Sequence, residues 1–359
     1  MSGSPYASSL GRLKVQFPSF LTRDALLALA AAPEVGEVTK LLEPTIYGND
    51  IIQNASLYQG APLLEVAVNR TLVRRNRLSL ESTPFAGKAV VSAYLRRWDI
   101  ENIELILSAK AQGRPVTEAE AFLVSSREIP AGIFAGTMTL DDFRMLLQQP
   151  TLEAIANALV RFGYGSVLLP LLEVYERSHD IFPLLTALDR EYYRNLSESS
   201  RFFQGDEWTV RNVIQSEIDV RNVLLLLKGK DGALAAEEIA ARFVEGGTIS
   251  KASGLDLYSA RTLAELITNL EPKFPSLPEG NPGYAENRSL TGYEVALSSE
   301  RAVRELKRLR TYPLSLSVIF TYLIHSELER IDLRRVIYGK LYGVPAEKIQ
   351  SQLVIARLT

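Results

Sequence analysis

One pattern of residue types occurs three times in this chain and could in principle support proton transfer. Each copy begins with an acid, has Asn or Asp three residues later, and ends with a lysine eleven residues after the acid. The three copies are Asp99, Asn102 and Lys110; Asp219, Asn222 and Lys230; and Glu329, Asp332 and Lys340. An acid and a base buried together can exchange protons with a substrate. In a helix the acid and the lysine would lie about 16 Å apart, too far for one reacting centre. We therefore interpret the pattern as structural.

The spacing predicts that each copy lies on one face of a helix. Eleven residues at about 100° each end only about 20° beyond three full turns. The positions between the polar ends are apolar: Ile103, Ile106 and Leu107; Val223, Leu226 and Leu227; and Leu333, Val336 and Ile337. We expect a buried stripe, with the acid at the positive end of the helix dipole and the lysine at the negative end.

Small residues support this reading of the helix ends. Ala109, Gly229 and Gly339 directly precede the three lysines, which favours close packing. A glycine then follows each lysine, at Gly113, Gly232 and Gly343, and this is typical of a helix C-terminus.

The copies begin 120 and 110 residues apart, so the chain is predicted to contain three similar helical units, approximately residues 1–116, 117–234 and 235–359. Helix-forming residues with apolar positions three and four apart occur throughout, for example at 24–30, 152–161 and 299–309. We expect an all-α fold. The many Pro and Gly residues at 271–292 predict a loop inserted in the third unit.

Composition excludes several classes of protein. The chain has 359 residues, no cysteine and a formal net charge of -2, so disulfides and thiol chemistry are excluded and whole-chain charge gives no reason to expect nucleic-acid binding. The longest apolar stretch, residues 311–326, reaches only about 24 Å as a helix, short of a bilayer core. We expect a cytosolic protein with this segment as a buried helix.

Other signs of chemistry are weak. No P-loop motif occurs, and Gly163-Tyr164-Gly165 lacks the rest of a dinucleotide fingerprint, which favours a turn between helices. His179 and His325 have no metal-motif spacing; we expect a surface loop residue and a helix residue. We predict no catalytic residue, no metal and no cofactor.

Two basic stripes are candidates for partner contact. Their members recur at helical spacing: Arg70, Arg74 and Arg77, and Arg301, Arg304 and Arg308. One interpretation is a solvated, salt-bridged helix face. The other is contact with an acidic protein surface or with anionic lipid headgroups.

The repeat residues also carry a family resemblance. The segments 94–103, 216–223 and 227–230 resemble signatures of the C subunit of archaeal A-type ATP synthases, a family related to the d subunit of the vacuolar ATPase. Further similar segments are 41–48, 175–176, 180–184, 187–193 and 338–345. Asp332 departs from the resemblance, because an Asn is expected there, and the segment from Glu271 looks expanded.

The resemblance implies a funnel-shaped protein of three similar domains around a pseudo-threefold axis. It also implies a non-catalytic central-stalk subunit of an A/V-type rotary ATPase, present as one copy per complex. Such a subunit is peripheral to the cytoplasmic face of the membrane and links the central shaft, made of the D and F subunits, to the proteolipid ring, which transports protons or sodium ions. The alternatives are a helical-repeat adaptor of another cytosolic complex and, with less support, an all-helical enzyme that uses scattered carboxylates.

Overall fold

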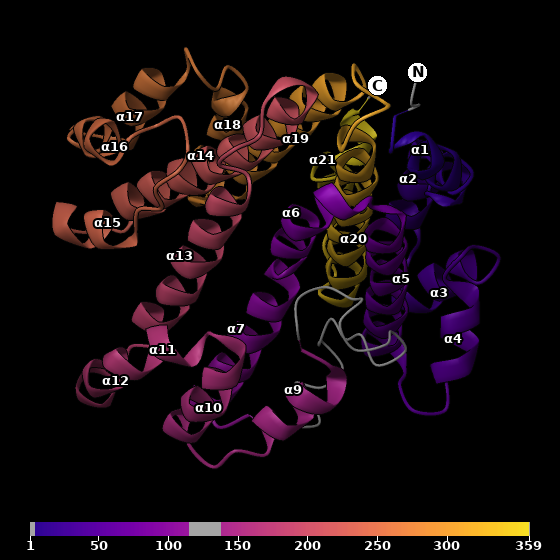
Figure 1. Cartoon of the computed structure of the whole chain (residues 1–359), viewed down its shortest axis with the longest axis horizontal. Helices are drawn as coiled ribbons and strands as arrows, with labels where there is room; N and C mark the ends of the chain where they lie inside the picture. The colour runs from indigo at the N-terminus through magenta and orange to yellow at the C-terminus, as the bar shows by residue number, and fades with distance from the viewer. Residues whose placement is uncertain (1–3, 115–137, 359) are drawn as a thin grey trace.

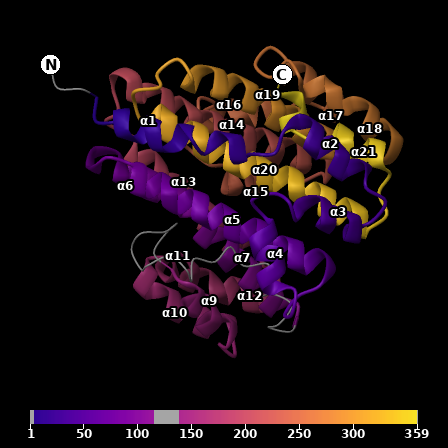
Figure 2. The same cartoon turned by 90° about the vertical axis from the view of Figure 1, so that its right-hand side faces the viewer.

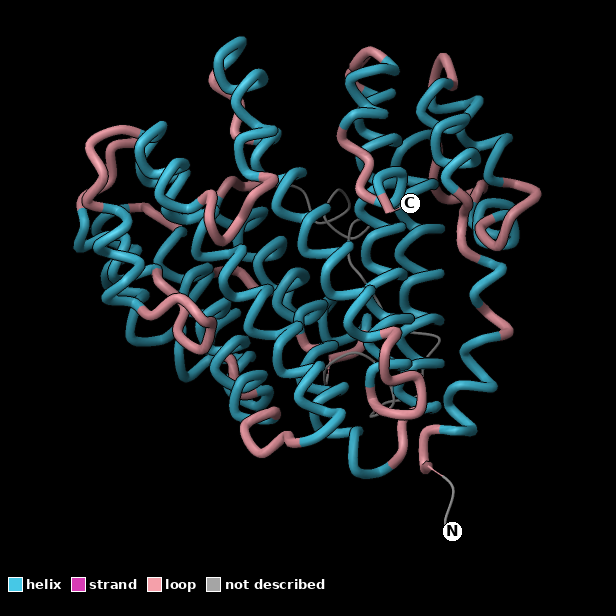
Figure 3. Tube along the Cα trace, turned by 90° about the horizontal axis from the view of Figure 1, so that it is seen from above, coloured by secondary structure: helices cyan, strands magenta, loops and turns pink. Residues whose placement is uncertain are grey.

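The protein is all-α over the residues that the computed structural model describes, 4–114 and 138–358, because every regular element in these two ranges is a helix (Figures 1 and 3). The longer helices are α5 (Gly60–Ser82), α6 (Phe85–Leu95), α7 (Arg97–Ala111), α13 (Phe182–Ser199), α14 (Trp208–Asp231), α19 (Thr291–Leu309) and α20 (Ser317–Leu341). The shorter helices are α1 (Ala7–Lys14), α2 (Arg23–Ala31), α3 (Val35–Leu42), α4 (Gly48–Asn54), α9 (Leu140–Leu147), α10 (Leu152–Leu159), α11 (Gly165–Leu168), α12 (Leu172–Ser178), α15 (Ala236–Arg242), α16 (Lys251–Tyr258), α17 (Leu263–Leu270), α18 (Asn281–Asn287) and α21 (Ala346–Ser351). The all-α prediction is confirmed.

The long helices pack in three groups, each of which brings together an earlier and a later helix of the chain. Helix α14 packs against α19, and α13 packs against α6 and α7. The most extensive helix contact joins α5 to α20, which lie side by side in Figures 1 and 2. This last group combines the first and final parts of the sequence.

Among the described residues, two hydrophobic clusters follow the same grouping and a third joins the groups. One cluster joins apolar residues between Leu26 and Val68 to others between Leu333 and Leu353. A second cluster lies entirely between Val220 and Leu297, and the largest cluster contains residues from all three groups of long helices. The contiguous units 1–116, 117–234 and 235–359 stay a prediction, and these clusters indicate that one unit is built from both ends of the chain.

All three repeats lie on α-helices, namely α7, α14 and α20. Their apolar stripes are almost completely buried; Leu226, for example, is 0% exposed. The lysines occupy the last helical turn, as predicted. The acids differ. Asp99 lies in the first turn of α7, but Asp219 and Glu329 lie in the interior of longer helices, so the expected pairing with the helix dipole is wrong for these two.

Each of the three helices ends in the same capping motif. The backbone N–H three residues after the motif lysine donates to the carbonyl of that lysine, and the next N–H donates to the carbonyl of the small residue before the lysine. This is the Schellman arrangement, which needs a left-handed residue three positions after the lysine. That residue is Gly113 in the first copy and Gly343 in the third, with φ of 64° and 67°. In the second copy it is Ala233, with φ of 52°, and not the predicted Gly232.

The segment 271–292, predicted as a loop, contains short helices. A 3₁₀ turn at Leu277–Gly280 leads directly into α18. Pro278 and Pro282 stand in the first two positions of these two elements, where a missing N–H costs no intrahelical hydrogen bond. The prolines therefore start helices here and do not exclude them.

The capping motif predicts opposite effects of glycine and alanine at equivalent positions. Ala233→Gly should stabilise the protein by about 1 kcal/mol, since an L-residue in the left-handed region costs about 1–2 kcal/mol and part of that gain is lost to the entropy of glycine. Gly343→Ala should destabilise it by a similar amount. The measurement is the denaturant midpoint of each variant; equal shifts of the same sign would contradict the shared cap geometry.

Candidate functional site at the junction of the motif helices

Three charged side chains from the three motif helices meet at one largely buried point. Arg97 begins α7, Glu217 lies on α14 and Glu327 on α20, each two residues before the motif acid of its helix. The Arg97 guanidinium donates from Nη2 to both oxygens of Glu217, at 2.9 and 3.0 Å, and from Nη1 to Oε2 of Glu327 at 3.0 Å. Equivalent positions of the three repeats are therefore in direct contact. We call this cluster the Arg97 junction.

Neighbouring groups complete the junction. Arg301 from α19 donates to Oε2 of Glu217 at 3.1 Å, so two cations face two carboxylates. The Tyr94 hydroxyl donates to Glu327, and the Tyr193 hydroxyl donates to Glu217, each at 3.0 Å. The Arg97 guanidinium also lies 3.7 Å from the centre of the Tyr94 ring. Arginine suits this position better than lysine, because its planar guanidinium group carries several N–H donors and can bind two carboxylates at once.

Burial and charge act in opposite directions on the two carboxyl groups. Burial tends to raise the pKa of Glu217, but Arg97 and Arg301 outweigh it and hold that pKa at about 2. Burial, together with the nearby Glu217, raises the pKa of Glu327 even though Arg97 opposes the shift. Glu217 therefore remains ionised at neutral pH and carries the main ionic contact of the junction.

The motif acids bind groups from the short-helix segments. The Tyr164 hydroxyl donates to Asp99 at 3.2 Å, and the Lys273 ammonium lies 3.0 Å from Asp219. The Tyr47 hydroxyl donates to Glu329, which also accepts from Arg75 at 2.7 Å. Each acid thus fixes a segment distant in sequence to its long helix, which explains why an acid is present in the helix interior.

The next polar position of the motif fixes the backbone 22 residues later. In the second copy the Asn222 amide donates to the carbonyl of Val244 at 2.7 Å and accepts from its N–H at 3.0 Å. In the third copy Asp332 accepts from the N–H groups of Val354 and Ile355, at 2.8 and 2.7 Å. A carboxylate cannot donate, so it suits a segment that presents two N–H groups. The departure from Asn at this position therefore has a structural reason.

Sequence patterns alone did not reveal the junction residues, although a signal was present. Extending the repeat two residues toward the N-terminus gives Arg97, Glu217 and Glu327, which are charged in every copy. Their signs differ, so a search for identical residues passes over them. The combination of one arginine and two glutamates is explained only by the structure, in which the three copies of the repeat contact one another.

The predicted basic stripes are largely occupied by ion pairs within the chain. Arg74 binds the buried Asp50, and Arg77 pairs with Glu81 at 2.6 Å. On α19, Arg301 belongs to the Arg97 junction, while Arg304 and Arg308 both pair with the buried Glu305. This is the arrangement expected of a salt-bridged helix face. Contact with a partner stays a prediction for Arg70, Arg74, Arg77, Arg301, Arg304 and Arg308.

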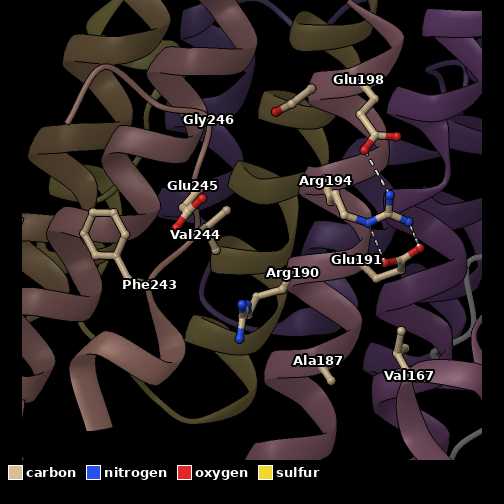
Figure 4. Close-up of a pocket in the computed structure, with 11 residues that line it drawn as sticks. Val167, Ala187, Arg190, Glu191, Arg194, Glu198, Phe243, Val244, Glu245 and Gly246 are labelled. Carbon is tan, nitrogen blue, oxygen red and sulfur yellow. Dashed lines mark hydrogen bonds and ion pairs between the residues drawn. The ribbon is translucent and has the colours of Figure 1, made fainter. Parts of the chain in front are cut away.

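Two surface pockets lie on either side of α13. Figure 4 shows the first, of about 520 Å³, where Arg194 is bound by Glu191 and Glu198 between α13 and residues 243–246. The second, of about 510 Å³, contains Glu104, whose pKa is raised to about 8 by burial and by the neighbouring Asp189. The Ser197 hydroxyl, which lines the first pocket, has no hydrogen-bond partner among the described residues, and the Tyr193 hydroxyl in the second pocket is bound to Glu217 of the Arg97 junction.

The remaining sequence candidates fit structural roles. Gly163, with φ of 86°, ends one helical turn just before α11, as predicted for a turn between helices. His179 ends α12 in a left-handed conformation, and His325 lies within α20, where burial and nearby arginines lower its pKa to about 4. Across residues 4–114 and 138–358, no helix is both long and apolar enough to span a bilayer, and no three potential metal ligands cluster.

Removal of the central cation should destabilise the fold strongly. Arg97→Met leaves two buried carboxylates without their shared partner, and breaking a buried ion pair in this way costs about 3–5 kcal/mol. The control is Arg77→Met, which loses a half-exposed pair and should change the free energy of unfolding by less than about 1 kcal/mol. Denaturant unfolding measures both, and an Arg97→Met variant as stable as the control would show that the junction does not hold the helices together.

Comparison with known proteins gives matches over nearly the whole chain. Residues 10–352 match the family model described as the ATP synthase (C/AC39) subunit. The chain is 36% identical to the C subunit of the A-type ATP synthase of Thermoplasma acidophilum, over 98% of both chains. It is 35% identical to the C subunit of Thermoplasma volcanium, over 97% of this chain and 98% of the relative. The C subunit of Methanocaldococcus jannaschii is 25% identical, over 98% of this chain and 86% of the relative.

These matches cover nearly the whole chain, including all three motif helices and the Arg97 junction. They agree with the expectation of a non-catalytic subunit that was drawn from the resemblance. The chain belongs to the ATP synthase C/AC39 family, as a C subunit of the A type.

Proposed function

We propose that the protein is the central-stalk rotor subunit that joins the D and F shaft to the membrane proteolipid ring. One copy per complex transmits torque between ATP synthesis or hydrolysis in the catalytic head and the transport of protons or sodium ions through the membrane. The subunit is peripheral and lies at the cytoplasmic face. The main support for this proposal is the Arg97 junction, together with the membership of this chain in the ATP synthase C/AC39 family.

A mechanical link between two rotating parts must resist twisting. The junction supports this role because one guanidinium binds α14 and α20 to the start of α7 in an interior of low polarity. Helices α5, α14 and α20 have 23, 24 and 25 residues without interruption, so a load applied at one end is carried along rigid elements.

We further infer that the three groups of long helices are units around a pseudo-threefold axis that passes through the Arg97 junction. The support is that the three copies contribute equivalent positions to one contact. Groups formed by α7 with α13, α14 with α19, and α20 with α5 then correspond, each with short helices at its far end. The unit of α20 and α5 is completed across the two chain ends.

Coupling is tested in a reconstituted complex that lacks this subunit. ATP hydrolysis by the catalytic head should continue, because this chain has no P-loop motif, whereas ion transport should be lost and should return when the subunit is added back. Hydrolysis and transport are measured side by side. Normal transport without the subunit, or loss of hydrolysis in the detached head, would refute the coupling role.

Partner contact by the first basic stripe is tested separately. Arg74 is left unchanged because it binds the buried Asp50, and the variant carries Arg70→Glu and Arg77→Glu. Co-purification of the shaft or the ring should weaken and become more sensitive to salt, since like charges then face the partner's acidic surface. Arg177→Glu, which breaks an exposed i,i+4 pair on α12, is the matched control. Assembly equal to the control at every salt concentration would exclude the stripe.

A further inference from the structure

Three chain connections meet at one end of the molecule. They are the links from α5 to α6, from α13 to α14 and from α19 to α20, and the start of α1 lies at the same end (Figure 2). The Thr209 and Ser317 hydroxyls, from the first turns of α14 and α20, are 2.7 Å apart. The Ser4 hydroxyl donates to the carbonyl of Leu314 at 2.6 Å, and the side chain of Leu316 packs close to Gly87. We call this end the linker face.

The linker face exposes large apolar side chains from all three connections. Phe85 is 94% exposed and Phe202 is 83% exposed. Trp208, Tyr312 and Leu314 are between 40% and 51% exposed. Side chains as exposed as Phe85 and Phe202 bury almost none of their apolar surface within this protein, so they contribute little to the stability of its core. Such a concentration of exposed apolar groups indicates an interaction surface for a partner molecule or a membrane.

The same face is electropositive. Lys88, Arg201, Arg211 and Arg310 lie beside the apolar groups, and none has a salt-bridge partner within residues 4–114 and 138–358. The Arg201 and Arg211 guanidiniums lie near the rings of Phe202 and Trp208, at 5.7 and 5.1 Å. Helices α6, α14 and α20 begin here and helices α5, α13 and α19 end here, so the opposite ends of their dipoles offset one another and the positive charge comes from the side chains. The acids on or next to the three links are Glu81 and Glu198, which pair with Arg77 and Arg194, and Asp206 and Glu207, of which Glu207 accepts a hydrogen bond from Tyr6.

We propose that the linker face binds directly to the surface of an anionic lipid bilayer. Protruding Phe and Trp side chains enter the headgroup region, and the neighbouring Lys and Arg side chains contact lipid phosphates. Two features favour lipid over a protein partner. The exposed aromatic groups come from all three connections, and Phe202 and Trp208 each have an arginine close to the ring, a combination of aromatic and basic side chains that is typical of a membrane-surface element. The proposal rests on the proposed function, since a rotor subunit above the ring has its membrane-facing end close to lipid.

Vesicle flotation with the purified full-length chain tests the proposal. The protein should float with vesicles of phosphatidylglycerol mixed equally with phosphatidylcholine, and about tenfold less with vesicles of neutral phosphatidylcholine alone, given the contribution of each basic residue near an anionic surface. The double variant Phe85→Ser and Phe202→Ser, and separately Arg201→Glu with Arg310→Glu, should each lower binding to anionic vesicles at least about tenfold.

Matched controls lie at the opposite ends of the long helices. Phe182→Ser removes another exposed aromatic side chain, at the start of α13, and Lys348→Glu reverses an exposed charge on α21; both should bind as wild type does. Circular dichroism confirms that every variant is folded. Equal binding to neutral and anionic vesicles, or unchanged binding by the linker-face variants, would overturn the proposal. If the wild-type protein binds no vesicles and the linker-face variants no longer co-purify with the ring, the lipid proposal is also overturned and the linker face is a protein interface. The transport assay separately shows whether the proposed coupling role itself fails.

Discussion

The arrangement of this molecule depends on one guanidinium group that three helices share. The Arg97 side chain is only 16% exposed, so little water reaches its charge, which is stable only while Glu217 and Glu327 remain in place. The two glutamates in turn would repel one another without it. Because each of the three residues comes from a different repeat, separating any one of the long-helix groups from the other two breaks at least one ion pair of Arg97.

Much of the fold follows from local patterns in the sequence. The helical period, the apolar stripes and the flanking small residues correctly predicted α7, α14 and α20, and Gly113 and Gly343 were correctly predicted to mark the ends of α7 and α20. These features depend on residues within a few turns of each other, so their physical cause is contained in a short segment. The left-handed Ala233 was not predicted, because only the hydrogen bonds of the cap show that the position, and not the residue type, is repeated.

The site was much less predictable, because it depends on contacts between distant segments. Helical spacing suggested that the motif acids stand at helix ends, where they would meet a dipole. In the structure Asp219 and Glu329 meet Lys273, Tyr47 and Arg75, which lie far away in the sequence. Likewise, helical spacing placed the arginines of α19 on one face but could not show that Glu305 and Glu217 neutralise them. Partner identity came from the resemblance and not from any of these patterns.

The shared core of the two chain ends has a consequence for biosynthesis. Glu329 accepts hydrogen bonds from Leu21, Tyr47 and Arg75, and the apolar side chains of this early segment pack against Leu333 and other residues near the end of the chain. A ribosome delivers the chain from the N-terminus, so these early helices emerge before the residues of α20 and α21 against which they pack have been made. The early helices therefore remain incompletely buried while residues 76–328 are synthesised. This part of the protein can therefore close only when translation is nearly complete, and the newly made N-terminal segment is the stretch that most needs protection from aggregation.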